Sequence, residues 1–182
     1  MKIKLTALLS ALFLFVSCSS TKGFRGKADF CGILTDTANH EISGYTVCIN
    51  GNQKCITNDS GVFVFPEVAS QNIKITGYKN GYEKINTEAF FYDENNFVCL
   101  TVRSREEVIA EIEHSLEQND LSKTNELIDS INYDESDDMI IFLKSIVSYL
   151  NHEYRKAERL ISKISCVDEN VEMFRKILKK EK

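Results

Sequence analysis

The sequence predicts an α+β multidomain fold in which an N-terminal antiparallel seven-stranded β-sandwich is followed by a C-terminal all-helical domain of hairpins. Two observations carry this prediction. From Lys27 to Arg103, short runs rich in Val, Ile, Thr, Phe and Tyr alternate with Gly, Asn and Asp, a pattern typical of strands and turns. After Arg103 the apolar residues recur at helical spacing instead. We therefore expect a domain of strands over residues 27–103 and a helical domain over residues 104–182.

The chain begins with a segment of the kind that directs export. Lys2 and Lys4 precede an apolar run from Leu5 to Val16, and small residues flank Cys18. A charged start, an apolar stretch and a small-residue cleavage site are the parts of a secretory signal. The run has about a dozen residues, whereas a helix that crosses a bilayer needs about 20. Residues 1–17 are therefore predicted to be a signal peptide that is removed.

The cleavage site carries a more specific motif. Phe15-Val16-Ser17-Cys18 resembles the lipobox of bacterial lipoproteins, with Phe15 where Leu is usual. The resemblance implies that lipid on Cys18 anchors the mature chain to the outer or inner membrane of a cell envelope, on the periplasmic side or at the surface. Residues 18–26 then form a lipidated tether, whose eight residues after Cys18 reach at most about 28 Å. The alternative is an ordinary signal peptide with an incidental cysteine.

Charge and residue types narrow the range of functions. Without Lys2 and Lys4, the mature chain has 20 basic and 27 acidic side chains. This excess argues against nucleic acid or anionic lipid as the main partner, because both select basic patches. The histidines His40, His114 and His152 are widely separated, and no Ser/His/Asp grouping, nucleotide loop or metal motif occurs. We expect a protein that is not an enzyme and that has no cofactor and no metal.

Six ranges of the first domain carry the clearest strand pattern. They are 30–35, 44–49, 54–57, 61–65, 72–78 and 97–102. In the fourth range every second residue is aromatic, so Phe63 and Phe65 are predicted to share a face and to lie in the core. Gly61 follows three turn-forming residues, and we expect it to adopt a positive φ.

Residues 32–82 resemble a carboxypeptidase regulatory-like domain, which has a transthyretin-type fold of seven strands. Four motifs occur in the family's order, namely Gly32-Ile33-Leu34-Thr35-Asp36, Ile42-Ser43-Gly44-Tyr45-Thr46-Val47, Thr57-Asn58-Asp59-Ser60-Gly61-Val62-Phe63 and Gly77-Tyr78-Lys79-Asn80-Gly81-Tyr82. The resemblance implies a non-catalytic domain, because the peptidase zinc site of that family lies in a separate domain. Tyr82 is expected to close one end of the sandwich.

The same resemblance bears on the cysteines that remain once Cys18 carries lipid. They are Cys31, Cys48, Cys55, Cys99 and Cys166. In a transthyretin-like arrangement the strands of Cys48 and Cys55 are neighbours, and so are those of Cys31 and Cys99. The resemblance therefore implies disulfides Cys48–Cys55 and Cys31–Cys99 in an exported protein. The alternative is that all five are reduced and pack as small hydrophobic side chains.

The second domain is predicted to contain five helices. Ser104-Arg105-Glu106-Glu107 matches a capping box that starts the first, and Ser165-Cys166-Val167-Asp168 offers another before the last. The acidic run from Asp134 to Asp138 is interpreted as a helix start, where acidic residues are favoured. No Gly/Ser-rich or Pro-rich linker separates the two domains, so they are free to pack against each other.

Two segments of the helical domain resemble each other and a known repeat. Asn119-Asp120-Leu121-Ser122-Lys123 and, 33 residues later, His152-Glu153-Tyr154-Arg155-Lys156-Ala157-Glu158 resemble the second-helix opening of tetratricopeptide repeats, whose period is 34. The resemblance implies TPR-like stacked hairpins with a concave surface for peptides. Phe142, Tyr149 and Tyr154 either line that surface or, as we favour, form the core of the repeats.

Two hypotheses for function follow. The first is a non-enzymatic, membrane-anchored envelope lipoprotein that binds an envelope protein partner as an adaptor or assembly factor. Because the tether enters at the sandwich, the helical domain points away from the membrane and is the expected binding part. The alternative is an envelope module that binds carbohydrate or peptidoglycan through the β-sandwich.

Overall fold

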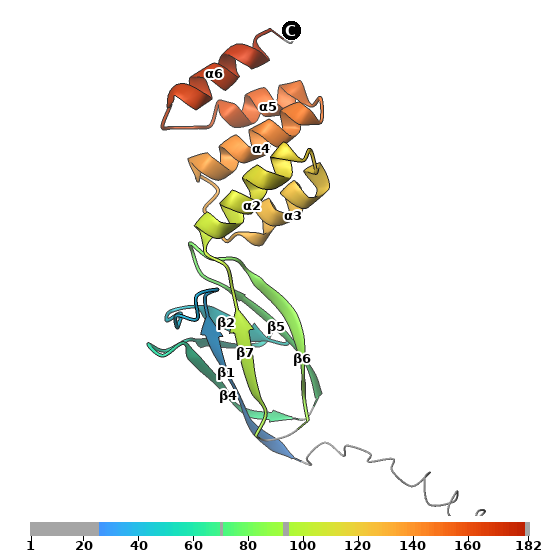
Figure 1. Cartoon of the computed structure of the whole chain (residues 1–182). Helices are drawn as coiled ribbons and strands as arrows, with labels where there is room; N and C mark the ends of the chain where they lie inside the picture. Colours follow the sequence, from blue (N-terminus) through green and yellow to red (C-terminus); the bar gives the residue numbers. More distant parts are fainter. Residues whose placement is uncertain (1–25, 70, 93–94, 181–182) are drawn as a thin grey trace, which may run out of the picture.

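The computed structural model describes residues 26–180 apart from 70 and 93–94. The strands lie at one end of an elongated molecule, and the helices are stacked at the other (Figure 1). The first strand, β1 (Lys27–Thr35), starts at the end of the sheet region that is farthest from the helices. The last helix, α6 (Glu169–Leu178), lies at the opposite end of the molecule.

Seven strands form two sheets in the described part of the chain. After β1 come β2 (Thr46–Ile49), β3 (Gln53–Ile56), β4 (Val62–Ala69), β5 (Gln71–Tyr78), β6 (Ile85–Phe91) and β7 (Phe97–Thr101). The first sheet, called sheet A below, has the order β4-β1-β7, and sheet B has the order β3-β2-β5-β6. The strands β1 and β7 pair in parallel, whereas the other pairs are antiparallel.

The predicted fold class, an antiparallel seven-stranded β-sandwich followed by TPR-like hairpins, is therefore wrong as stated. Among the described residues the strands divide into separate sheets of three and four, and five short helices follow them. The β1–β7 pair is parallel because the chain leaves sheet B after β6 and crosses to sheet A at the end where β1 begins. Strand β6 was not among the six predicted ranges, since its middle residues Asn86, Thr87 and Glu88 are polar and exposed.

Both sheets contribute to one hydrophobic core. Sheet A supplies Phe30 and Phe63, and sheet B supplies Ile73 and Ile75, all of them almost fully buried. Two predictions are confirmed here: Phe63 lies in the core with 1% of its surface exposed, and Gly61 has a φ of +70°. Gly61 also packs so closely that a Cβ on it would lie 2.5 Å from the carbonyl oxygen of Leu34, which leaves no room for a larger residue.

The five predicted helices are present. They are α2 (Arg105–Glu117), α3 (Leu121–Ser130), α4 (Asp138–Leu150), α5 (Tyr154–Ile161) and α6. The capping box at α2 is confirmed: the Ser104 side chain accepts a hydrogen bond from the amide of Glu107, whose carboxylate accepts one from the amide of Ser104. The acidic run does start a helix, because Asp137 caps α4 through the amide of Ile140.

The second predicted capping box is wrong. The residue that caps α6 is Asp168, which accepts a hydrogen bond from the amide of Val171. The amides of Ser165 and Cys166 instead donate to the carboxylate of Asp138 at 3.0 and 2.8 Å. These bonds hold the pKa of Asp138 below its usual range, with the Cys166 amide as the larger cause. The α5–α6 loop is therefore tied to the start of α4.

The turns α2–α3 and α4–α5 have the same geometry. Asn119 and His152, which are 33 residues apart, have φ angles of +55° and +60°. The following residue in each turn closes the hairpin with a backbone hydrogen bond: the amide of Asp120 donates to Ser115 at 2.9 Å, and that of Glu153 donates to Ser148 at 2.8 Å. The 33-residue spacing of the sequence thus corresponds to two equivalent helical hairpins.

Candidate protein-binding surface

Two neighbouring rows of residues on the outward side of sheet A are apolar on all three strands. Cys31 in the central strand lies opposite Val64 of β4 and opposite Phe97 of β7. Residues paired across strands point to the same side of a sheet, so this row of three, and the next row two residues further along, face outward together. The six residues, called the sheet A face below, are Cys31, Ile33, Val62, Val64, Phe97 and Cys99.

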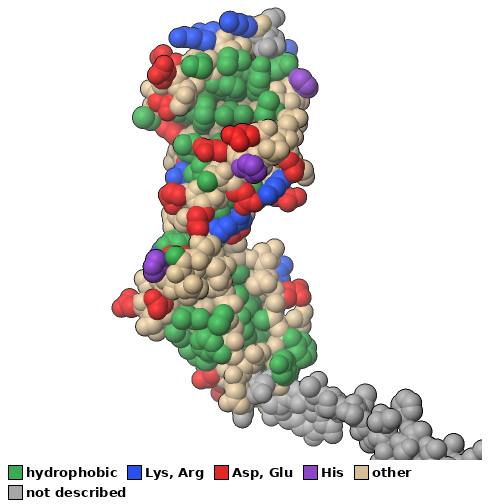
Figure 2. Space-filling view, in the orientation of Figure 1, with side chains coloured by type: hydrophobic (Ala, Val, Ile, Leu, Met, Phe, Trp, Pro, Cys, Tyr) green, Lys and Arg blue, Asp and Glu red, His purple; other side chains and the backbone are tan. Residues whose placement is uncertain are grey.

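Three of the six residues of the sheet A face, Val64, Phe97 and Cys99, are exposed, the other three are half-buried, and neither row carries a charge. Phe97 is 51% exposed and Val64 is 42% exposed. Figure 2 shows hydrophobic side chains gathered over the sheet end of the molecule, where Figure 1 places β1, β4 and β7. Contiguous exposed apolar surface of this kind marks binding sites, whereas single exposed apolar residues are ordinary. The sheet A face is therefore the candidate binding surface.

The edge of sheet A adds a second means of binding. Among the described strands, β7 pairs only with β1 and lies at the edge of its sheet. Its residues, Phe97 to Thr101, include none of the Lys or Pro that protect edge strands. An extended segment of a partner could hydrogen bond to this edge while its side chains cover the sheet A face.

Sequence reasoning missed this face although its signal was present. In the range 61–65 the aromatic alternation predicts that Phe63 and Phe65 lie in the core, and both are buried. The intervening Val62 and Val64 are also apolar, and a strand that is apolar on both faces is expected to be covered on both. The pairing with β7, which completes the face, depends on a parallel contact that the sequence did not indicate.

The two predicted disulfides are not formed, and all five described cysteines are free. The neighbouring strands were predicted correctly, but their register prevents bridging. Cys48 lies opposite Lys54, and Cys55 lies opposite Val47, so the two thiols point to opposite sides of sheet B. Cys31 and Cys99 share the sheet A face but lie two positions apart along parallel strands. That offset places their Cα atoms about 8 Å apart, beyond the reach of a disulfide.

The Cys31 thiol belongs to the apolar surface of the sheet A face. Burial raises the pKa of the Cys31 thiol, and the nearby Asp29 carboxylate raises it further. A thiol with a raised pKa stays protonated at neutral pH and is a poor nucleophile. Cys31 therefore contributes a small hydrophobic side chain to the face and no activated sulfur.

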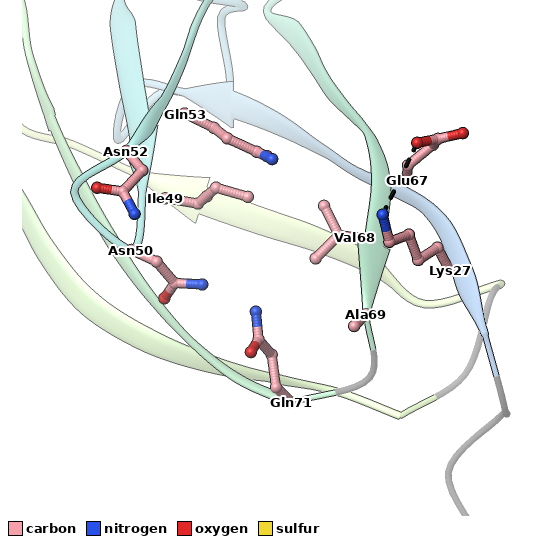
Figure 3. A pocket seen from close by; sticks show the side chains of 9 residues that line it. All are labelled: Lys27, Ile49, Asn50, Asn52, Gln53, Glu67, Val68, Ala69 and Gln71. Atoms are coloured by element: carbon pink, nitrogen blue, oxygen red, sulfur yellow. Dashed lines mark ion pairs between the residues drawn. The ribbon is translucent and has the colours of Figure 1, made fainter.

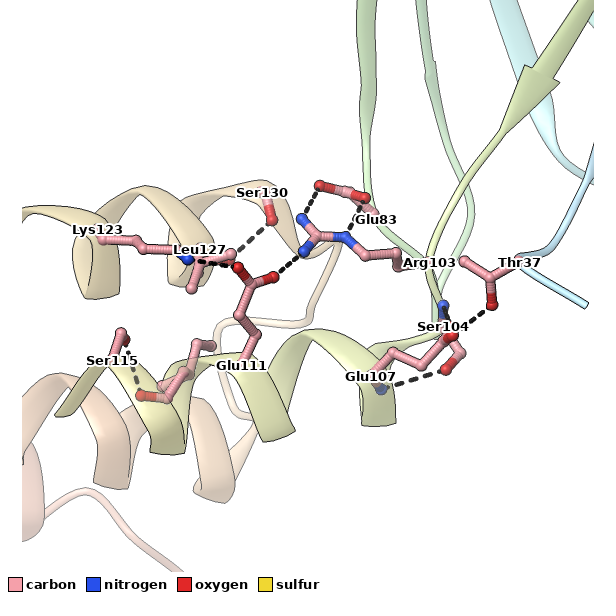
Figure 4. Close-up of polar contacts among 11 residues, drawn as sticks. Thr37, Glu83, Arg103, Ser104, Glu107, Glu111, Ser115, Lys123, Leu127 and Ser130 are labelled. Atoms are coloured by element: carbon pink, nitrogen blue, oxygen red, sulfur yellow. Dashed lines mark hydrogen bonds and ion pairs between the residues drawn. The ribbon is translucent and has the colours of Figure 1, made fainter. Parts of the chain in front are cut away.

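A charged network joins the sheets to the helices (Figure 4). Arg103 follows β7 and donates to both carboxylate oxygens of Glu83, at 2.9 and 2.5 Å, and to Glu111 of α2. Lys123 of α3 contacts the other oxygen of Glu111 at 2.6 Å. Glu83 raises the pKa of Arg103, and the pKa of Glu111 is lowered, first by Lys123 and then by Arg103. One guanidinium thus links a sheet loop to a helix.

Backbone hydrogen bonds strengthen the same joint. The amide of Lys84 donates to the Ser130 carbonyl at 2.7 Å, and the amide of Asn132 donates to the Tyr82 carbonyl at 3.1 Å. Tyr82 is half-buried and packs edge-on against Tyr45, with the ring centroids 6.5 Å apart. The buried hydroxyl at this end of the sheets belongs to Tyr45, which donates to the Glu83 carbonyl at 2.6 Å. The helices are therefore held in a defined orientation on the sheets.

Removing the guanidinium should loosen this joint. We expect Arg103→Met to lower the free energy of unfolding by about 1–2 kcal/mol, less than the sum of its charged hydrogen bonds because the partners are partly exposed. Hydrogen exchange at the amides of Lys84 and Asn132 should accelerate. Lys123→Met, which removes only the outer ion pair, should cost less than about 1 kcal/mol. Equal unfolding energies and exchange rates in the two variants would contradict this role of Arg103.

A cleft of about 480 Å³ opens between the sheets at the end where the chain enters (Figure 3). Its lining is made of four carboxamides, an ion pair and three apolar residues, namely Asn50, Asn52, Gln53, Gln71, Lys27, Glu67, Ile49, Val68 and Ala69. Lys27 and Glu67 are 3.9 Å apart. Carboxamides both donate and accept hydrogen bonds, so this cleft suits a ligand rich in hydroxyl or amide groups.

The predicted lipidation site, Cys18, lies outside the described residues. Phe142 and Tyr149 pack against the buried cluster of the last helices, which confirms the core interpretation for these two. No three His, Cys, Asp or Glu residues gather into a potential metal site within the described ranges. None of the helices that the structure describes is long and apolar enough to cross a membrane.

Comparisons with known proteins give no family. No protein-family model and no curated protein matches the chain, so the resemblances to lipoproteins and tetratricopeptide repeats gain no support from them. Among solved structures, an N-terminal interface mutant of the type II cohesin–X-dockerin complex from Acetivibrio cellulolyticus is 14% identical, with a TM-score of 0.38 over 60% of this chain and 99% of that one.

Two further structures show a similar degree of likeness. A candidate carbohydrate-binding protein from Bacteroides uniformis is 13% identical, with a TM-score of 0.35 over 42% of this chain and 41% of that one. The 3-chlorocatechol 1,2-dioxygenase of Rhodococcus opacus is 12% identical, with a TM-score of 0.34 over 45% of this chain. The match spans 61% of that dioxygenase. Likeness at this level identifies no relative of the chain.

Proposed function

We propose that this protein is a non-enzymatic envelope lipoprotein that is anchored by lipid on Cys18 and binds another protein through the sheet A face. The observation that carries the binding role is the exposed, uncharged surface around Val64 and Phe97. Water contact with such a surface is unfavourable, and covering it gains roughly 25 cal/mol for each Å² of apolar area. The partner is therefore a protein that presents a complementary apolar face.

The proposal assigns a different part of the chain to binding than the sequence did. The helical domain was the expected binding part, yet its aromatic residues Phe142 and Tyr149 pack into its own core. The large exposed apolar side chains of the helices include Met139 and Leu150 at the two ends of α4 and the pair Met173 and Ile177 on α6. The joint at Arg103 lets the helices act as a rigid extension beside the bound partner.

The thiol of Cys99 provides a direct test, because it lies on the sheet A face and is exposed. A variant that keeps only Cys18 and Cys99 is treated in native envelopes with a thiol-to-amine crosslinker. The matched control keeps only Cys18 and Cys166, whose thiol is exposed on the α5–α6 loop. We expect one dominant protein adduct of constant mass from Cys99 and none of that mass from Cys166. Identical adduct patterns, or no adduct from Cys99, would count against the proposal.

A second candidate function rests on the amide-lined cleft. Asn50, Asn52, Gln53 and Gln71 surround a space floored by buried Ile49 and Val68, which suits a glycan or peptidoglycan fragment. The cleft lacks an aromatic residue among its nine lining residues, so it offers no stacking platform for a sugar ring. Sedimentation of the protein with purified sacculi, combined with no Cys99 adduct, would favour this candidate over the first.

A further inference from the structure

Three exposed aromatic side chains lie where β6 ends and β7 begins. Phe90 is 59% exposed, Tyr92 is 45% exposed and Phe97 is 51% exposed. The rings of Phe90 and Tyr92 are stacked, with centroids 5.8 Å apart and planes at 26°. The side-chain amide of Asn96 donates to the carbonyl of Phe90 at 3.0 Å, which holds the start of β7 beside this pair. These three residues are called the aromatic tip below.

The backbone imposes this exposure. Phe91 lies between Phe90 and Tyr92, points inward and is fully buried, with its ring edge-on to Phe30 at 5.2 Å. Because side chains alternate along a strand, anchoring Phe91 in the core forces its two neighbours outward. Phe90 and Tyr92 therefore cannot be hidden by rotation of the strand.

The aromatic tip lies at the end of the sheets from which the anchor would extend. Lys27, the first residue of β1, pairs with Ala69 of β4. Phe91, the last residue of β6, pairs with Gln71, two positions after Ala69. Phe97 is opposite Cys31, four residues further along β1 than Lys27. If Cys18 carries lipid, the eight residues that follow it reach at most about 28 Å. The tether would therefore hold this end of the sheets close to the bilayer, whereas the helices lie at the opposite end of the molecule (Figure 1).

We propose that the aromatic tip inserts into the interface of a zwitterionic bilayer beside the lipid anchor, an inference that rests on the proposed anchoring at Cys18. Aromatic side chains favour the headgroup region, where an apolar ring and a polar group are both accommodated. Charge favours a zwitterionic surface: Glu88, on the same strand as Phe90, is exposed, and the mature chain has 27 acidic against 20 basic side chains. These carboxylates oppose an anionic surface and tolerate a zwitterionic one.

The consequence is a defined orientation of the protein on its membrane. Lipid on Cys18 is a single point of attachment and does not by itself fix the orientation of the protein. A second contact at the aromatic tip holds the long axis of the molecule away from the bilayer and leaves the sheet A face open at the side. Phe97 belongs to both surfaces, so the bound partner would lie next to the membrane.

The absence of tryptophan from the chain allows a single fluorescent reporter. Full-length protein with Phe90→Trp is purified with its lipid and reconstituted into phosphatidylcholine/phosphatidylethanolamine vesicles. We expect its emission to shift to shorter wavelength than in the lipid-free soluble form, and to be quenched by lipids brominated in the upper acyl chain. The matched control is Tyr78→Trp, on the outward side of sheet B at 46% exposure, which should show neither change.

The outcomes separate this inference from the proposed function. A lipidated, vesicle-bound protein in which Phe90→Trp behaves like Tyr78→Trp would overturn tip insertion and leave the anchor intact. A protein whose Cys18 carries no acyl mass and that stays soluble would overturn both. A shift that appears without vesicles as protein concentration rises would assign the tip to a second copy of the chain. Quenching only with anionic lipid would contradict the charge argument.

Discussion

Phe63→Ala is expected to lower the free energy of unfolding by about 3–5 kcal/mol. Phe63 is 1% exposed and its ring centroid lies 6.3 Å from that of Phe30 and 6.1 Å from that of Phe65. Phe63 of β4 pairs with Gly32 of β1, and its ring covers Gly32 closely. A Cβ atom added to Gly32 would lie 2.3 Å from the Cζ atom of Phe63. Truncation leaves a cavity between two sheets whose backbones are held by hydrogen bonds, so the cavity closes only in part.

The adjacent Val64 supplies a control on the same strand. Val64 points outward and is 42% exposed, so Val64→Ala should cost less than about 1 kcal/mol. Equilibrium urea unfolding followed by circular dichroism measures both variants. A loss for Phe63→Ala no larger than that for Val64→Ala would mean that the inward and outward faces of sheet A have been assigned the wrong way round.

Val64→Glu is expected to have the largest effect on binding. The substitution puts a charge on an uncharged face, and covering that charge with a partner costs several kcal/mol unless the partner supplies a cation. The yield of the Cys99 adduct should fall by about tenfold to a thousandfold, which corresponds to about 1.4–4 kcal/mol of binding free energy. Stability should change by no more than about 1 kcal/mol, because the position is on the surface.

The control for this variant is Tyr78→Glu. Tyr78 is a similarly exposed apolar residue, 46% accessible, and it lies on the outward side of sheet B opposite Thr46. We expect the adduct yield of Tyr78→Glu to stay within about twofold of the unmodified chain, since a twofold change is about 0.4 kcal/mol. Equal losses in both variants would indicate a general effect of negative charge and would remove the basis for assigning the sheet A face.

Local features of the fold could be predicted from the sequence because their causes are local. The capping box at Ser104, the positive φ at Gly61 and the burial of Phe63 each depend on a few neighbouring residues. The 33-residue similarity also corresponds to equivalent turns at Asn119 and His152. In each of these cases the backbone geometry follows from side-chain size, from turn chemistry or from a hydrogen bond within one turn of chain.

Features that depend on pairing between distant strands could not be predicted in the same way. The motif order suggested which strands are neighbours, but a shift of one residue turns a side chain to the opposite face. That shift separates Cys48 from Cys55, and the offset of two positions separates Cys31 from Cys99. The candidate binding surface was missed for the same reason, because it combines three strands whose alignment is set by tertiary contacts.

The most direct test of the account compares three positions for a photoreactive amino acid in native envelopes. Position 64 lies on the sheet A face, position 78 lies on the outward side of sheet B, and position 173 lies on α6, where Met173 is 54% exposed. We predict that irradiation yields one discrete protein adduct from position 64 and no adduct of that mass from positions 78 or 173. An adduct from position 173 without one from position 64 would contradict the account and would assign partner binding to the helices.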